Sequence, residues 1–282
     1  MANGVRTVSR VVRPTPVLEG AGVRLKRTIA TRELDYLDPF LLLDHFGSDN
    51  PDDYLAGFPM HPHRGIETVT YMLAGAVQHR DSLGNAGIIG AGDVQWMTAG
   101  RGIMHEEMPE PRDGRMEGFQ LWVNLPAKLK MTQPRYQEVL ESRIPGLRRE
   151  DGSLIKVIAG TLEGIEGPVT EIAAEPTYLD LTLAAGARFA TPVPASHTAF
   201  AYVYRGAARF GNASEEVAGP ALAILEGGDE VAITAGERGA SLLLVSGAPL
   251  GEPIARYGPF VMNTRAEIEQ ALRDLRNGTF VR

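Results

Sequence analysis

Short segments in which apolar and polar residues roughly alternate, separated by glycine and proline, constrain the fold of this chain more than any other feature. Clear examples cover residues 68–73, 119–123 and 178–183. Alternating side chains point to opposite faces of an extended chain, so each segment is predicted to be a half-buried strand. The 282 residues include 32 glycines and 19 prolines, which supply turns between strands. We therefore predict an all-β protein.

The C-terminus is the exception to this pattern. Thr264 and Glu267 have the spacing of a capping box, in which each side chain accepts a hydrogen bond from the other residue's backbone. Apolar residues then follow with helical spacing, and Asn277-Gly278 supplies a stop. We predict one short amphipathic helix over residues 264–276, docked on a β-scaffold.

Two parts of the sequence resemble each other, which suggests an internal duplication. The Gly-Asp turn at Gly92 recurs at Gly228, and the segment 71–75 is echoed by 202–206. We predict two tandem β-barrels, over residues 1–130 and 153–282. The stretch 131–152 is rich in proline and charge and is predicted to be the linker.

Composition excludes several classes of protein. Lys and Arg number 28 against 35 Asp and Glu, a formal charge of −7, which argues against nonspecific binding of nucleic acid. No apolar run is long enough to cross a bilayer or to serve as a signal peptide, so a cytoplasmic location is expected. The chain has no cysteine, so any metal must be held by histidine nitrogen and carboxylate oxygen.

Histidines are concentrated in one part of the chain. His61-Pro62-His63 places two imidazoles on one face of an extended segment, and His105 and Glu107 place an imidazole and a carboxylate in the same way. If both segments line one barrel, three nitrogens and one carboxylate face a common centre. Such a set suits a divalent ion such as Fe(II), Mn, Co, Ni, Cu or Zn.

The spacing approximates the two-part signature of cupin barrels. In most cupins the glutamate of the first motif is the fourth ligand, which here would be Glu67. It lies four residues after His63, an even spacing, so the same face is reachable. Glu67 and Glu107 are therefore alternative carboxylate ligands.

Longer motifs resemble the pirin family. They cover residues 58–69, 92–109, 121–125 and 258–264. The resemblance implies two tandem cupin barrels with one metal, usually iron, in the N-terminal barrel. It also implies that His61, His63, His105 and Glu107 are the ligands and that Glu67 lies close to the site without binding the ion.

The second copy lacks the ligand set. By alignment, Pro192 and Pro194 stand opposite His61 and His63, while Ser241 and Leu243 stand opposite His105 and Glu107. His197 is isolated and is predicted to be a loop or surface histidine. The second barrel is therefore predicted to be a structural or docking module.

Other polar and aromatic residues near the motifs are less informative. His45 is predicted to pack or hydrogen-bond structurally, whereas His79 either lines the pocket or lies on the surface. Trp96 and Trp122 are predicted to be core residues first and pocket walls second.

The resemblance implies an enzyme like the quercetinases, which open the central ring of flavonols with O₂. A flavonol would bind the ion through its 3-hydroxyl and 4-carbonyl oxygens, and Glu107 would take the hydroxyl proton. The alternative is a non-enzymatic, iron-dependent regulatory protein that senses redox state and binds a protein partner. Because two barrels already pair within one chain, a monomer is expected.

Overall fold

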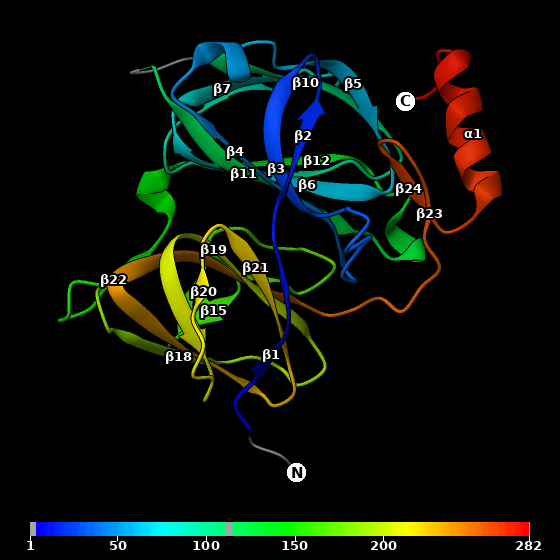
Figure 1. Ribbon diagram of the computed structural model, residues 1–282. Coiled ribbons are helices and arrows are strands. Elements are labelled where there is room, and N and C mark those ends of the chain that lie inside the picture. Colours follow the sequence, from blue (N-terminus) through cyan, green and yellow to red (C-terminus); the bar gives the residue numbers. More distant parts are fainter. Residues whose placement is uncertain (1–3, 111–113, 282) are drawn as a thin grey trace. The chain divides into compact units, whose positions relative to one another are not determined.

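The computed structural model describes residues 4–110 and 114–281, which form two compact units. The first barrel consists of residues 15–141 and 250–281 within this part of the chain. The second barrel consists of residues 4–14 and 142–249. Strands dominate both, which confirms the predicted all-β fold (Figure 1).

The first barrel is built from two antiparallel sheets. The seven-stranded sheet has the order β12 (Arg135–Val139), β9 (Val94–Thr98), β6 (Ile66–Ala74), β11 (Met116–Asn124), β4 (Phe40–Ser48), β3 (Val23–Ile29), β2 (Thr15–Glu19). The four-stranded sheet has the order β5 (Phe58–His63), β10 (Ile103–Glu110), β7 (Ala76–Asp81), β8 (Ala86–Ile89). Short 3₁₀ turns cover Pro51–Asp53 and Ala127–Leu129, and a third turn, Glu141–Arg143, begins where this part of the first barrel ends. An apolar cluster that includes Leu25, Met72 and Val77 packs the two sheets together.

The second barrel contains one large sheet. Its order is β1 (Thr7–Val12), β21 (Ala221–Glu226), β19 (Thr198–Phe210), β22 (Glu230–Gly247), β17 (Thr177–Leu183), β14 (Leu154–Ala159), β13 (Gly146–Arg148). Strand β18 (Arg188–Pro192) pairs with β22, β20 (Val217–Ala218) with β19, and β15 (Thr161–Leu162) with β16 (Ile165–Glu166). The barrel encloses an apolar core of Leu, Val, Ile, Ala and Phe side chains.

Glycines at matching places in the two barrels support the predicted duplication. Gly92 and Gly228 have φ values of +87° and +81°, and Gly75 and Gly206 have values of +75° and +70°. Residues with a Cβ rarely adopt this left-handed conformation. Both copies therefore keep glycine where the backbone makes the same unusual turn.

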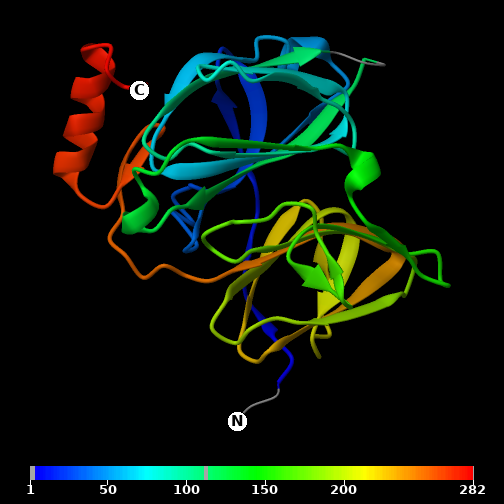
Figure 2. The same cartoon turned by 180° about the vertical axis from the view of Figure 1, so that it is seen from behind.

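The C-terminal segment packs on the first barrel. It forms the hairpin of β23 (Ala255–Tyr257) and β24 (Phe260–Met262) and then α1 (Arg265–Arg276). Thr264 and Glu267 form the predicted capping box, which confirms the helix. The buried face of α1 packs on Phe260 and Met262. Figure 2 shows this orange and red segment beside the cyan and green strands. No helix in the described part of the chain is long and apolar enough to cross a membrane.

The compact units do not follow the predicted boundaries of 1–130 and 153–282. Strand β1 pairs with β21 in the second barrel, and residues 250–281 pack on the first. The predicted linker 131–152 contains two strands, because β12 pairs with β9 and β13 pairs with β14. Both are short strands at sheet edges, where proline and charge are common. A proline-rich, charged composition is thus shared by linkers and edge strands and does not distinguish them.

Candidate metal centre

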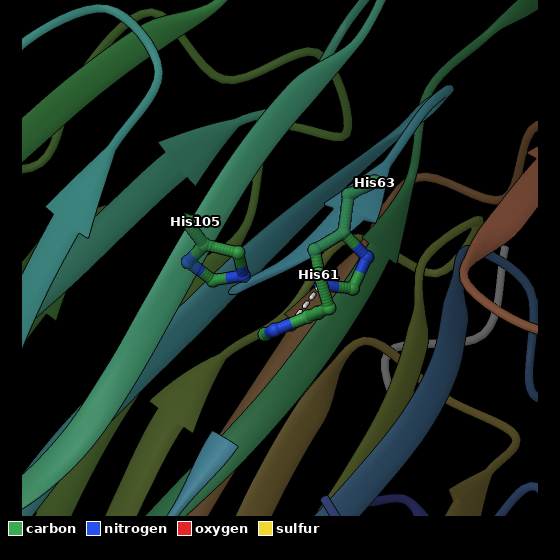
Figure 3. Close-up of side chains that lie close together, drawn as sticks. All are labelled: His61, His63 and His105. Carbon is green, nitrogen blue, oxygen red and sulfur yellow. Dashed lines mark hydrogen bonds between the residues drawn. The ribbon is translucent and has the colours of Figure 1, made fainter. Parts of the chain in front are cut away.

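Two neighbouring strands of the four-stranded sheet carry the three histidines. His61 and His63 lie on β5 with Pro62 between them, so both rings point to the same side. Strand β10 runs antiparallel to β5 and places His105 directly opposite His61. Figure 3 shows the three rings turned toward one another. The predicted two-residue spacing and the register of one strand pair therefore account for this grouping.

The imidazoles are close enough to share one ion. Each offers a ring nitrogen, and the three atoms lie within 4.8 Å of one another. The Nε2 atoms of His61 and His63 are 3.0 Å apart. Two nitrogens that bind one ion at about 2.1 Å are held about 3 Å apart when their bonds are perpendicular. The ring of His105 has its centroid 4.3 Å from that of His61 and 5.0 Å from that of His63.

The electrostatic environment keeps these histidines neutral. Burial lowers the pKa of His105 well below its ordinary value, and the His63 and His61 rings lower it further. Burial likewise lowers the pKa of His63 and of His61. Neutral imidazole is the form that binds metal. Both ring nitrogens of fully buried His105 lack a hydrogen-bond partner, which is costly unless another group is bound. The donor set therefore fits a metal ion.

Glu107 lies beside the three histidines but outside the group that they form. A shift in register between β5 and β10 follows His105, so Glu107 stands opposite Phe58. Its Oε1 accepts a hydrogen bond of 2.9 Å from the Thr70 hydroxyl. Burial raises the pKa of Glu107 to about 7, and the Thr70 hydrogen bond opposes this shift. Its carboxylate shares a pocket with His61 and His63, and its assignment as a ligand stays a prediction.

Glu67 does not share a face with His63, contrary to the inference from even spacing. Strand β5 ends at His63, and Gly65, with φ of +81°, separates it from β6 in the other sheet. Glu67 is buried, and its two oxygens accept hydrogen bonds from Trp96 Nε1 (3.1 Å) and Thr98 Oγ1 (2.8 Å). Trp96 and Thr98, both on β9, therefore hold the two oxygens of Glu67.

The remaining candidates from the sequence have structural surroundings. His45 lies 3.4 Å from Glu117 and packs on Phe119, as predicted. His79 neither lines the pocket nor lies on the surface. It is fully buried, with Nε2 3.4 Å from Asp81 and its ring stacked on Tyr136.

A pocket of about 460 Å³ opens beside the histidines. Its walls come from both sheets of the first barrel and from the C-terminal hairpin. Most of the exposed lining surface is apolar, although charged and polar side chains are as numerous as apolar ones, and Trp122 meets the His63 ring edge-on at 5.1 Å between centroids. The lining residues include Leu25, Arg27, Leu42, Asp44, Phe46, Phe58, Pro59, His61, His63, Glu107, Gln120, Trp122, Arg256 and Pro259.

Sequence reasoning missed the charged part of this pocket. Arg27 donates to Asp44 through Nε and Nη2, at 2.8 and 2.7 Å, and to Glu19 through Nη1 at 2.7 Å. Arg256 reaches the pocket from the C-terminal hairpin. Alternating spacing predicts a strand, but it does not show which polar side chains point into a pocket. The motif at residues 258–264 drew attention to the hairpin without indicating that it completes the pocket.

The two barrels and the histidine group are those of a two-barrel cupin protein. The Pirin family profile matches residues 22–123, and the profile of the Pirin C-terminal cupin domain matches residues 178–281. The chain belongs to the pirin family.

Relatives and a solved structure agree with this assignment. A Pseudomonas aeruginosa protein named "Putative quercetin 2,3-dioxygenase" is 50% identical over 93% of this chain and 94% of its own length. A pirin-like protein of Caulobacter vibrioides is 48% identical over 98% and 99%. The crystal structure named quercetin 2,3-dioxygenase from Acinetobacter baumannii has a TM-score of 0.90 and 38% identity. It covers 98% of this chain and 99% of that one.

We expect about one metal ion per chain and no change in metal content in the His197→Ala variant. His61, His63 and His105 are the one histidine-containing group suited to a metal within residues 4–110 and 114–281. His197 lies in a turn of the second barrel, where its backbone N–H donates to the Pro194 carbonyl. Anomalous scattering from crystals would locate the ions. A specific ion beside His197 would contradict the argument that the second copy has lost its site.

Proposed function

We propose that this protein is a metal-dependent dioxygenase that opens the central ring of flavonols such as quercetin with O₂ and releases carbon monoxide. The observation that carries the proposal is the pocket of about 460 Å³ with three neutral, converging imidazoles at one side. Pockets for small organic ligands have volumes of about 300–1,000 Å³ and mostly apolar walls. The names of the two quercetin dioxygenase relatives support the same reaction class.

The histidines and Glu107 would hold one divalent ion, for which we propose Fe(II). Nitrogen and carboxylate donors suit iron and several other first-row ions. When bound, the ion supplies Lewis acidity toward the flavonol oxygens and access to O₂. A chelating 3-hydroxyl and 4-carbonyl would fix the flavonol at the histidine side of the pocket.

The protein side chains would orient the substrate and move one proton. Trp122, Phe46 and Phe58 offer apolar surface to the flavonol rings. Glu107 lines the same pocket as His61 and His63, which supports a role for its carboxylate in taking the proton of the 3-hydroxyl. The Thr70 hydroxyl lies 2.9 Å from Glu107 Oε1 and 2.8 Å from the Gln120 amide oxygen, which fixes the carboxylate's orientation.

Metal-loaded protein should consume quercetin and O₂, whereas metal-free protein should not. A flavone without the 3-hydroxyl should bind more weakly and stay unchanged, because it lacks both the chelating oxygen and the acidic proton. Glu107→Gln should lower turnover by at least about 100-fold, since an amide cannot act as the base. Loss of the flavonol absorption band, O₂ uptake and carbon monoxide release are the measurements.

Two outcomes would reject the proposed dioxygenase activity. One is an equal rate with metal-loaded and metal-free protein, and the other is equal reaction of the flavone. The iron-dependent regulatory protein would then take first place. It would be tested by searching for protein partners whose binding depends on the redox state of the iron.

A further inference from the structure

Arg256 occupies an unusual position at the pocket. It lies on β23, whose partner strand β24 begins two residues after the Gly258 turn. Its Nη1 donates a hydrogen bond of 3.2 Å to the Leu41 carbonyl, and its guanidinium lies 5.1 Å from the centre of the Trp122 ring. Trp122 in turn lies 5.1 Å from His63. One wall of the pocket thus consists of His63, the Trp122 indole beside it and the Arg256 guanidinium on the far side of the indole.

Asp35, Asp44 and Glu19 are the carboxylates whose charges act on Arg256, and none of them receives a hydrogen bond from it among the residues that the structure describes. Asp44 receives two hydrogen bonds from Arg27, and Glu19 receives one from the same guanidinium. Arg256 itself forms a single hydrogen bond, to Leu41, among the residues that the structure describes. A guanidinium has five N–H donors in a fixed planar arrangement. Most donors of Arg256 are therefore available to a ligand in the pocket.

The geometry points to Arg256 as a specificity-determining residue that binds a negatively charged oxygen on an aromatic ligand. The ligand's chelating group would lie at the histidines, its ring along Trp122, and its ionised phenol or carboxylate at the guanidinium. This inference rests on the proposed function for the chemistry at the histidines. It adds that the preferred substrates are planar aromatic anions rather than neutral flavonols.

A merely structural role for Arg256 predicts a different result. Suppose that the hydrogen bond to Leu41 and the cation–π contact with Trp122 only hold the hairpin in place. Removal of the Arg256 guanidinium would then weaken binding of every pocket ligand to the same degree. A role in specificity would weaken binding of the anionic ligand alone. The test therefore compares two ligands that share the chelating group and the ring system and differ by one carboxylate.

The experiment measures binding without turnover. Purified protein of known metal content is titrated under argon with 3-hydroxyflavone and with derivatives that carry a carboxylate at position 4′ or 7. Quenching of tryptophan fluorescence reports binding, because Trp122 lines the pocket. Thermal unfolding of each variant shows whether it remains folded.

We expect the wild-type protein to prefer at least one carboxylate derivative over 3-hydroxyflavone. Arg256→Met should weaken binding of that derivative about tenfold or more, because a hydrogen bond to a charged group is lost. Binding of 3-hydroxyflavone should change less than about twofold. Arg256→Lys should restore part of the preference, since it keeps the charge but loses the planar donors. The control is Arg265→Met on α1, whose side chain is 92% exposed.

Two results would overturn the inference. One is an equal loss of affinity for charged and neutral ligands in Arg256→Met, which is the structural outcome. The other is an unchanged preference for the carboxylate. If the Arg256-dependent preference is present but no flavonol is turned over, the inference of an anion-binding site at Arg256 is supported and the proposed dioxygenase activity is rejected. If flavonols are turned over but the preference is absent, the dioxygenase activity is supported and the anion-binding role of Arg256 is rejected.

Discussion

His105→Ala should deprive the purified protein of most of its bound metal. His105 supplies one of three nitrogens within 4.8 Å of one another, and it stands opposite His61 on the paired strand. Even residues that only orient a metal ligand cost about 10–100-fold in affinity when they are replaced, so removal of a ligand should cost more. His61→Ala and His63→Ala should behave alike. Elemental analysis after dialysis against a fixed free-metal concentration is the measurement.

Glu67→Gln is the matched control for this prediction. Glu67 belongs to the same motif as the first two histidines, but its oxygens accept from Trp96 and Thr98. An amide at this place keeps an acceptor for the Trp96 N–H, so the variant should retain its metal. Full retention of metal in His61→Ala would refute the ligand assignment. So would loss of metal in Glu67→Gln together with retention in Glu107→Gln.

The contrast between these glutamates illustrates what sequence spacing can predict. His61 and His63 share a face because both belong to one strand, where the two-residue repeat is a property of the extended backbone. The same repeat fails for Glu67, because the left-handed Gly65 intervenes and the chain moves to the other sheet. The spacing of residues therefore predicts which side chains share a face within one strand, but it does not predict this across a turn.

Contacts between segments that are far apart in the chain could not be predicted from the sequence, for a related reason. The capping box of α1 is local and was predicted correctly, but nothing within residues 264–276 indicates which barrel the helix packs on. The structure answers this through Arg64, which donates to Asp274 at 2.7 Å and lies over the Phe280 ring. Arg64 follows His63 directly. The hydrogen bond between Arg64 and Asp274 joins residues 210 positions apart in the sequence. It attaches the C-terminal segment beside the predicted metal ligand His63.

Lys130→Met should destabilise the first barrel by about 3 kcal/mol or more. Lys130 is 1% exposed, and its Nζ donates to three oxygens: Gly65 O at 2.9 Å, Asn124 Oδ1 at 2.6 Å and Val261 O at 2.9 Å. Methionine fills a similar volume but leaves these acceptors without their donor. Each buried polar group left unsatisfied costs about 1–3 kcal/mol. Urea unfolding of the full chain at pH 7 is the measurement.

The choice of pH follows from the charge on this side chain. Burial lowers the pKa of Lys130 to about 8, opposed by Glu252 and Glu267, so the amine is largely protonated at pH 7 and can donate three hydrogen bonds. Lys128→Met is the control, because Lys128 is exposed on the neighbouring 3₁₀ turn and its replacement should change stability by less than about 0.5 kcal/mol. Equal unfolding midpoints for the two variants would show that the three oxygens find other donors.

Metal content provides a second measurement for Lys130→Met. The Gly65 carbonyl that Lys130 holds belongs to the turn that follows His63, and Val261 belongs to the strand beside Arg256. Replacing one buried side chain should therefore loosen both the histidine strand and the hairpin that completes the pocket. We expect Lys130→Met to bind metal more weakly than Lys128→Met does, under conditions in which both variants remain folded. Equal metal affinity would mean that Lys130 stabilises the barrel without positioning the site.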